Sequence, residues 1–309
     1  MIKLFIVLIT TTIIANEIIT PLPKEVHDYE LNKALLGKAL FEDKRLSQDN
    51  TISCSSCHNT KEGGDDNRKL SIGINNSIGL VNTPTVLNSR FNFVQFWDGR
   101  SGTLKEQASG PIHNPIEMNS NFKEIIIKLS NDSFYVSKFK EIYNSSIKEE
   151  HIINAIVEYE KALITPNSKF DKYLNGDKNI LTYEEKKGFE LFKEFGCISC
   201  HNGVNIGGNL FQKVGIMEQY FPEEKQHFGR YNITQNPEDK FYFKVPSLRN
   251  VELTAPYLHD GSANDLKSVI DVMLKYQIGT IYNEQDIKYI EKFLLTLTGE
   301  NPKIDRENF

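Results

Sequence analysis

The chain has 309 residues, of which 39% are hydrophobic and 25% charged, and its formal net charge is −5. This composition is typical of a globular protein and excludes a disordered or fibrous chain, and without a basic run we expect no nucleic-acid partner. At roughly 150 residues per domain, the length accommodates about two domains.

The chain begins with a segment typical of an export signal. Lys3 precedes an apolar run from Leu4 to Ile14, and Ala15 supplies a small residue before a cleavage site. The run is short for a membrane span, although an uncleaved anchor and a buried N-terminal helix are alternatives. We therefore predict a signal peptide over residues 1–15 and a periplasmic mature protein.

Helical spacing recurs through the rest of the chain. Apolar stripes mark helices over 31–40, near 148–164 and over 287–297. Thr182 and Glu185 form a capping box that opens a further helix. The sequence therefore predicts a mainly α protein, with long irregular loops between the helices.

Two stretches read as irregular. The Gly- and Asn-rich stretch 70–88 is predicted to be a loop, and 164–179 has the Pro, Gly and Asn content of a linker. We expect the domain boundary in this linker, with an N-terminal domain over 16–165 and a C-terminal domain over 166–309.

All four cysteines lie in two C-x-x-C-H motifs, CSSCH at 54–58 and CISCH at 197–201. This is the attachment signature of a c-type haem, in which the His binds the iron. A single C-x-x-C could instead be redox-active or bind zinc, and exported cysteines could form disulfides. Two motifs that use every cysteine favour two covalent haems. The predicted attachment residues and proximal iron ligands are Cys54, Cys57, His58, Cys197, Cys200 and His201.

The chain also repeats itself downstream of each motif. The matching blocks, with the same internal spacing, are PTVLNSR (84–90) with FWDGRSGTLKE (96–106), and PSLRNVE (246–252) with YLHDGSANDLKS (257–268). A tandem duplication of a cytochrome c-like unit explains the repeat. It places Trp97 and His259 at equivalent positions.

Each iron needs a sixth ligand or stays open. In the second half Met217 and Met273 compete, and a thioether ligand suits an electron-transfer haem. Met273 lies late in its unit, as in small cytochromes c, so we predict that Met273 is the ligand. In the first half, the stretch 70–88 contains no His, Met, Lys or Tyr.

Further motifs complete the pattern: LGKALFEDKRLSQDNTISCSSCH, NTPTVLN, FNFVQFWDGR, EQASGPIHNPIEM, LITPNSKFD, GCISCHNG and KVPSLRNVELTAPYLHDG. With them the chain resembles the bacterial diheme cytochrome c peroxidase family over nearly the whole mature sequence. The resemblance implies a peroxidatic haem in the N-terminal domain and an electron-transfer haem in the C-terminal domain. It also implies a calcium ion between them and a homodimer.

The resemblance assigns roles by position. It implies that Glu117 is the distal acid–base carboxylate, that Gln107 is the amide beside it and that Trp97 lies between the haems. The implied calcium ligands, an oxygen-rich set that suits Ca²⁺, are Asn82, Thr254 and Pro256. The chemistry agrees for Glu117, because a carboxylate near an open haem can move a proton between the two peroxide oxygens.

One position departs from the family. Many members have the sequence SIGH, whose His binds the peroxidatic iron in the resting enzyme, whereas this chain has SIGI and Ile74. We therefore predict an open N-terminal haem in the oxidised protein. His113 could instead reach that iron, although we favour a hydrogen-bonding role for it beside Glu117. For His259 we predict a hydrogen-bonded structural role.

Three functions compete. The favoured one is a peroxidase that takes electrons from a small cytochrome c or cupredoxin through the His201–Met273 haem. A diheme electron carrier is an alternative, but Glu117 and Gln107 argue against it. A partner-protein oxidase, related to the diheme enzymes that mature tryptophan-derived quinones, is another. In those enzymes a tyrosine ligates the second haem, so Met273 favours the peroxidase.

Overall fold

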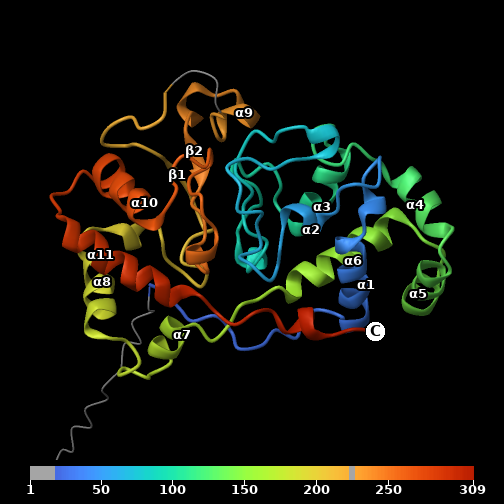
Figure 1. Cartoon of the computed structure of the whole chain (residues 1–309), viewed down its shortest axis with the longest axis horizontal. Coiled ribbons are helices and arrows are strands. Elements are labelled where there is room, and N and C mark those ends of the chain that lie inside the picture. Colours follow the sequence, from blue (N-terminus) through green and yellow to red (C-terminus); the bar gives the residue numbers. More distant parts are fainter. Residues whose placement is uncertain (1–17, 223–226) are drawn as a thin grey trace, which may run out of the picture.

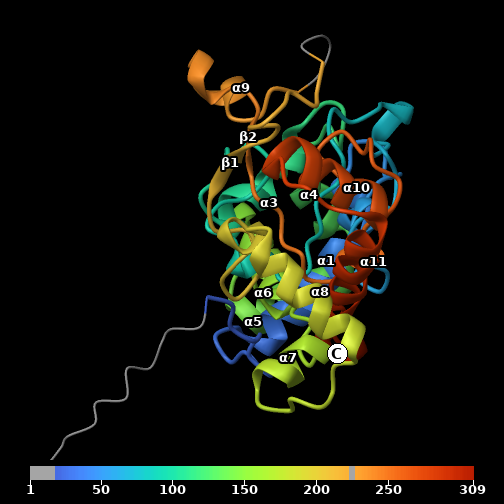
Figure 2. The same ribbon diagram turned by 90° about the vertical axis from the view of Figure 1, so that its left-hand side faces the viewer.

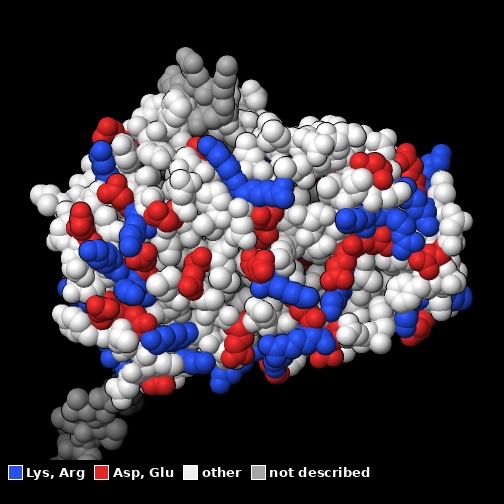
Figure 3. All heavy atoms as spheres, in the orientation of Figure 1, with Lys and Arg blue, Asp and Glu red and all other residues white. Residues whose placement is uncertain are grey.

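The computed structural model describes residues 18–222 and 227–309, so the predicted signal peptide lies outside the described residues. The described part is mainly helical, as predicted, with one antiparallel sheet of two strands, β1 (Phe211–Lys213) and β2 (Tyr242–Lys244). Figure 1 shows two lobes side by side, one from each half of the chain. None of the described helices is long and apolar enough to cross a membrane. On the face seen in Figure 1, Lys and Arg side chains are interspersed with Asp and Glu side chains (Figure 3).

The helices divide between the two lobes. The N-terminal lobe contains α1 (Leu31–Glu42), α2 (Cys54–Cys57), α3 (Leu104–His113), α4 (Phe122–Ser130), α5 (Ser133–Tyr143) and α6 (Glu149–Ala162). The C-terminal lobe contains α7 (Lys169–Leu174), α8 (Tyr183–Glu194), α9 (Tyr231–Thr234), α10 (Leu266–Val272) and α11 (Glu284–Leu294). The predicted helices correspond to α1, α6, α8 and α11. The predicted capping box at the start of α8 is present, since Thr182 accepts a hydrogen bond from the backbone of Glu185.

The predicted linker is not irregular throughout, because α7 lies within it. Ser168 and Asp171 form a capping box at its start. Phe170 is fully buried, and Asp171 forms a buried ion pair with Arg249 at 2.6 Å. These tertiary contacts outweigh the Pro, Gly and Asn content on which the linker prediction rested.

Each lobe is built on one close helix crossing. In the N-terminal lobe α1 packs on α6, and a Cβ at Gly37 would lie 1.9 Å from the carbonyl oxygen of Ala155. In the C-terminal lobe α8 packs on α11, and a Cβ at Gly188 would lie 1.9 Å from the carbonyl oxygen of Tyr289. Both glycines therefore let two helix backbones touch. Each crossing sits beside the C-x-x-C-H motif of its lobe.

The repeat seen in the sequence is also present in the backbone. Asn88 and Asn250, at matching positions, both adopt left-handed conformations, with φ of 60° and 59°. A short antiparallel bridge follows at the same spacing in each lobe, Gln95 with Ser101 and Tyr257 with Ala263. The helices α3 and α10 then begin at matching residues, Leu104 and Leu266.

The two ends of the described chain cross to the opposite lobe. Ile19 is buried in the C-terminal hydrophobic core, and the carbonyl of Thr20 accepts a hydrogen bond from Arg249. Ile304 is buried in the N-terminal core, and Asp305 accepts a hydrogen bond of 2.7 Å from the Tyr159 hydroxyl. In Figure 1 the C-terminus accordingly lies beside α1. Figure 1 also shows α8 and α11 at the other end of the molecule, and the end-on view in Figure 2 shows these two helices side by side.

Candidate active site

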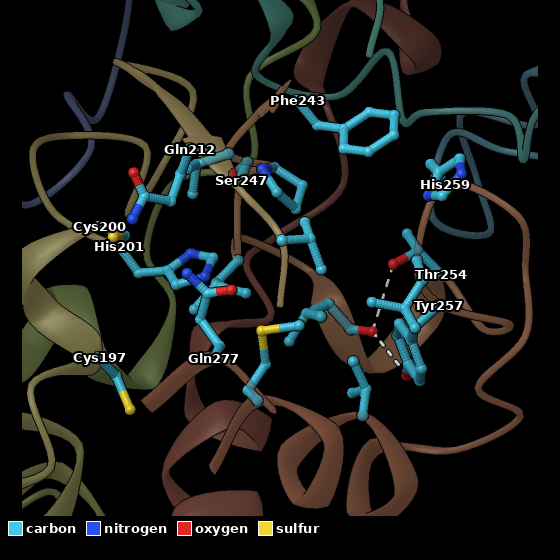
Figure 4. Close-up of a pocket in the computed structure, with 18 of the residues that line it drawn as sticks. Cys197, Cys200, His201, Gln212, Phe243, Ser247, Thr254, Tyr257, His259 and Gln277 are labelled. Atoms are coloured by element: carbon cyan, nitrogen blue, oxygen red, sulfur yellow. Dashed lines mark hydrogen bonds between the residues drawn. The ribbon is translucent and has the colours of Figure 1, made fainter. Parts of the chain in front are cut away.

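A cavity of about 240 Å³ occupies the C-terminal lobe. Cys197, Cys200, His201 and Met273 all line it, and most of the remaining lining is apolar. In Figure 4 the ring of His201 lies between Cys200 and Gln277, while Phe243 and His259 lie across the cavity. Hydrogen bonds from Thr254 and Tyr257 to the carbonyl of Val251 brace the wall near His259.

The histidines of the two C-x-x-C-H motifs, His58 and His201, have the same kind of surroundings: each ring is buried and faces a backbone carbonyl. Nδ1 of His58 lies 3.1 Å from the carbonyl oxygen of Gly64, and Nδ1 of His201 lies 3.4 Å from that of Ile206. Burial lowers the pKa of each imidazole to about 4. A neutral ring whose Nδ1 faces a carbonyl presents Nε2 to a metal. Both sites therefore fit the proximal ligand of a c-type haem.

The two candidate methionines, Met217 and Met273, have different surroundings in the structure. Met273 lines the cavity and opens a π-helical segment, Met273–Ile278, a rare conformation that often marks functional sites. Met217 is 60% exposed and packs outside this segment, where its backbone N–H donates to the carbonyl of Tyr276 at 3.0 Å. Of the two, Met273 therefore shares the cavity with His201.

Glu117 is held by hydrogen bonds in the N-terminal lobe. Its Oε1 accepts a hydrogen bond of 2.7 Å from the Asn114 side chain. Burial raises the pKa of Glu117 above the usual range of a glutamate, while the positive charge of Arg100 and the Asn114 hydrogen bond act to lower it. Asn114, the C-cap of α3, is a residue that sequence reasoning missed, although it stands three residues before Glu117.

The loop that carries Ile74 is folded onto the Glu117 segment. Ile74 is 1% exposed, and its backbone N–H donates to the carbonyl of Glu117 at 2.9 Å. A Cβ at Gly73 would lie 2.0 Å from the carbonyl oxygen of Ile116. Ile72 and Ile78 form a bridge that closes the loop. Ile74 therefore lies against the backbone of Glu117, the residue predicted to be the acid–base carboxylate.

Two other residues singled out in the sequence, Gln107 and His113, lie on α3. Gln107 lies on α3, and its side-chain Oε1 is buried without a hydrogen-bond partner among the described residues. Such an unpaired acceptor is typical of a site that binds a further group. His113 is exposed, faces Phe122, and its Nδ1 lies 2.9 Å from the carbonyl oxygen of Ser109. The predicted hydrogen-bonding role beside Glu117 thus belongs to Asn114 rather than to His113.

Trp97 connects the lobes. Its indole N–H donates to the carbonyl of Asn82 at 2.8 Å, and its own carbonyl accepts a hydrogen bond of 2.8 Å from the backbone N–H of Lys244. The ring meets Phe243 edge to face and lines the C-terminal cavity. Trp97 is therefore a residue of the N-terminal lobe that forms part of the wall of the second site.

A polar network around the buried Asp98, next to Trp97, was not found from the sequence. Arg100 contacts Asp98 at 2.9 Å, and His227, from the C-terminal lobe, lies 3.5 Å from the same carboxylate. Burial acts to raise the pKa of Asp98, but His227 and Arg100 lower it overall. The contact between Asp98 and His227 links the two lobes. The positive charge of Arg100 also acts to lower the pKa of Glu117.

His259, for which a hydrogen-bonded structural role was predicted, is packed among aromatic rings. It is 3% exposed, stacks on Phe243 at 4.2 Å and meets Phe221 edge to face. Its Nε2 has no hydrogen-bond partner in the described part of the chain. Burial lowers the pKa of His259 to about 4, so the ring is neutral.

The three residues implied as calcium ligands come from both lobes to the same cavity wall. Asn82, Thr254 and Pro256 all line the cavity. The side-chain amide of Asn82 donates to the carbonyl of Arg68 at 2.8 Å, which orients its oxygen. Among residues 18–222 and 227–309, no group of three or more His, Cys, Asp or Glu side chains forms a metal cluster. Calcium binding stays a prediction.

Comparisons with known proteins agree with this geometry. The profile of the di-haem cytochrome c peroxidase family matches residues 31–179. The chain is 45% identical over 289 residues to the cytochrome c551 peroxidase of Nitrosomonas europaea, covering 93% of this chain and 86% of that protein. It is 46% identical over 287 residues to the cytochrome c peroxidase Ccp of Escherichia coli, covering 92% of this chain but 62% of that protein's length.

The arrangement in space is shared as well. A solved structure of a MauG-like protein associated with microbial copper homeostasis superposes with a TM-score of 0.80 at 28% identity, covering 94% of this chain and 96% of that one. Similarity in sequence and in structure thus extends across both lobes and both C-x-x-C-H motifs. The chain therefore belongs to the di-haem cytochrome c peroxidase family.

Proposed function

We propose that the chain reduces H₂O₂ to two waters, with two electrons and two protons. The observation that supports this most directly is Glu117, a half-buried carboxyl group fixed at one oxygen by Asn114. A pure electron carrier has no use for such a group. The N-terminal haem, held by Cys54, Cys57 and His58, would supply the redox chemistry that breaks the O–O bond.

The roles of the pocket residues follow from their hydrogen bonds. Oε1 of Glu117 is occupied by Asn114, so Oε2 takes the proton from one peroxide oxygen and returns it to the other. The raised pKa of Glu117 suits both steps, because a carboxyl near its pKa can accept and release a proton. Gln107, whose amide oxygen is unpaired, orients the peroxide.

Electrons enter through the second lobe in this proposal. A small cytochrome c or cupredoxin reduces the haem held by Cys197, Cys200, His201 and Met273. Trp97 lies on the path to the first haem. The protein acts in the periplasm after loss of residues 1–15, as a homodimer with Ca²⁺ at Asn82, Thr254 and Pro256. Because Ile74 stands where other members carry a distal His, no ligand has to leave before peroxide binds.

Turnover with a reduced donor tests the proposal. The purified di-haem protein is mixed with reduced small cytochrome c and H₂O₂, and both reactants are followed. We expect two donor molecules oxidised for each peroxide consumed. Donor oxidation without peroxide loss would identify an electron carrier instead. Failure to oxidise a small donor, combined with peroxide-driven oxidation of a protein side chain, would identify a partner-protein oxidase.

A further inference from the structure

The cavity of the C-terminal lobe has an unbalanced charge. Among the described residues that line it none is an Asp or Glu, whereas two are lysines, Lys213 on β1 and Lys244 on β2. Lys213 is exposed, but Lys244 is only 6% exposed. A ligand that fills this space beside Lys244 would meet a positive charge and no negative charge from these lining residues.

Among the described residues, Arg249 is also a buried cation, but unlike Lys244 it has an acidic partner. Arg249 is 1% exposed and is paired at 2.6 Å with the buried carboxylate of Asp171. For Lys244 the described residues provide no ion pair. Lysines are almost never fully buried unless paired, because desolvation of the ammonium group is costly. Burial accordingly lowers the pKa of Lys244 to about 8, and an anion beside it would restore the charged form.

The anion that fits is part of the expected cofactor. Cys197, Cys200, His201 and Met273 place a c-type haem in this cavity, and a haem carries two propionate carboxylates. We propose that Lys244 binds a propionate of the C-terminal haem and thereby raises the potential at which this haem accepts an electron. The backbone N–H of Lys244 donates to the carbonyl of Trp97 at 2.8 Å, so the backbone of Lys244 is anchored to Trp97, which also lines this cavity.

The direction of the expected change in the haem potential follows from the charge of the lysine. A ferric haem has one more positive charge than a ferrous haem, so a nearby cation favours the reduced state. Lys244→Met removes the cation and keeps a side chain of similar length. We expect a lower midpoint potential for the Met-ligated haem, measured by optical redox titration of the holoprotein. Lys244→Arg keeps the charge and should retain the wild-type potential.

Two controls make the test specific. Lys288→Met removes an exposed charge on α11 of the same lobe and should leave the potential unchanged. The propionate-bending band in the resonance Raman spectrum should shift in Lys244→Met but not in Lys288→Met. If Lys244→Met does not retain its haem, Lys244→Gln is titrated in its place and judged by the same criteria.

Two results would overturn the proposal. A potential of the Lys244 variant equal to that of Lys288→Met would show that the lysine does not act on the haem. A lowered potential with an unchanged propionate band would make Lys244 a remote charge without a propionate contact. The inference rests on haem binding at Cys197 and Cys200 but not on peroxide turnover. If the protein carries both haems but fails the turnover assay, the midpoint potential and the propionate band still test the role of Lys244.

Discussion

At the scale of single residues, Glu117 combines two opposing influences. Its burial favours the protonated form, while Asn114 and Arg100 favour the carboxylate. The balance leaves the pKa above the usual range of a glutamate. As a base, Glu117 works only when ionised, so the rate of the peroxide reaction should fall as the pH drops through this raised pKa.

Glu117→Gln tests that assignment. The amide can still accept the hydrogen bond from Asn114 but cannot carry the proton, so we expect about 10²–10⁴-fold slower peroxide turnover with both haems bound. The acid limb of the pH–rate profile should disappear with it. Glu106→Gln, which changes an exposed glutamate on α3, is the matched control. Near-normal turnover in Glu117→Gln would remove Glu117 from the mechanism.

Met273 is the second residue with a distinct chemical consequence. Imidazole stabilises ferric iron more than a thioether does, so Met273→His should lower the potential of the C-terminal haem strongly and slow its reduction by the donor. The measurement is a redox titration with stopped-flow reduction. Met217→Ala, at an exposed position outside the cavity, should change neither. Loss of the Met-type spectrum in Met217→Ala would instead identify Met217 as the ligand.

At the scale of elements, we expect the loop around Ile74 to decide how the first haem is controlled. Gly73 and Ile74 hold the loop on the backbone of Ile116 and Glu117. An isoleucine has no atom that can bind iron. His113, the other candidate, is exposed and faces Phe122. The described loop therefore offers the first haem no distal ligand.

We accordingly expect a high-spin N-terminal haem, open or water-bound, in the fully oxidised protein. Oxidised protein mixed with H₂O₂ in a stopped-flow instrument should react without prior reduction, and its resting EPR spectrum should show the high-spin signal. Ile74→His restores the family's ligand type and should make the reaction depend on reduction. A low-spin bis-His signal in the wild type, with no reaction until an electron is added, would contradict this.

At the scale of the whole molecule, one buried threonine joins the two repeats. The hydroxyl of Thr165 accepts hydrogen bonds from the side-chain amides of Asn88 at 2.7 Å and Asn250 at 2.8 Å. These are the matching left-handed asparagines of the two lobes. Thr165 is 2% exposed, so neither amide has water to replace the hydroxyl.

Thr165→Val should therefore destabilise the junction of the lobes. Valine keeps the shape but leaves two buried amide donors without an acceptor, at about 1–3 kcal/mol each. Urea unfolding of the holoprotein, followed by the haem absorbance of both lobes, measures the change in the free energy of unfolding. Thr51→Val alters an exposed threonine and should change it little. Equal stability of the two variants would show that Thr165 is not needed at this junction.

The sequence by itself determined what depends on near neighbours along the chain. The spacing of the C-x-x-C-H motifs, the apolar stripes of α1, α6 and α11 and the capping box of α8 are local patterns. The duplicated blocks predicted the structural repeat, because equal spacing in the two halves is visible without coordinates. The residue types Glu117 and Met273 were visible in the same way.

Only the tertiary structure decided contacts between segments far apart in the chain. These include the burial of Phe170 that makes α7 a helix, the crossing of the chain ends and the pairing of Asp98 with His227. The same holds for Lys244, whose place in a cavity with no acidic side chain among its described lining residues cannot be predicted from the local sequence KVPSL. Local patterns are set by backbone geometry over a few residues, whereas burial and charge pairing depend on how distant segments pack.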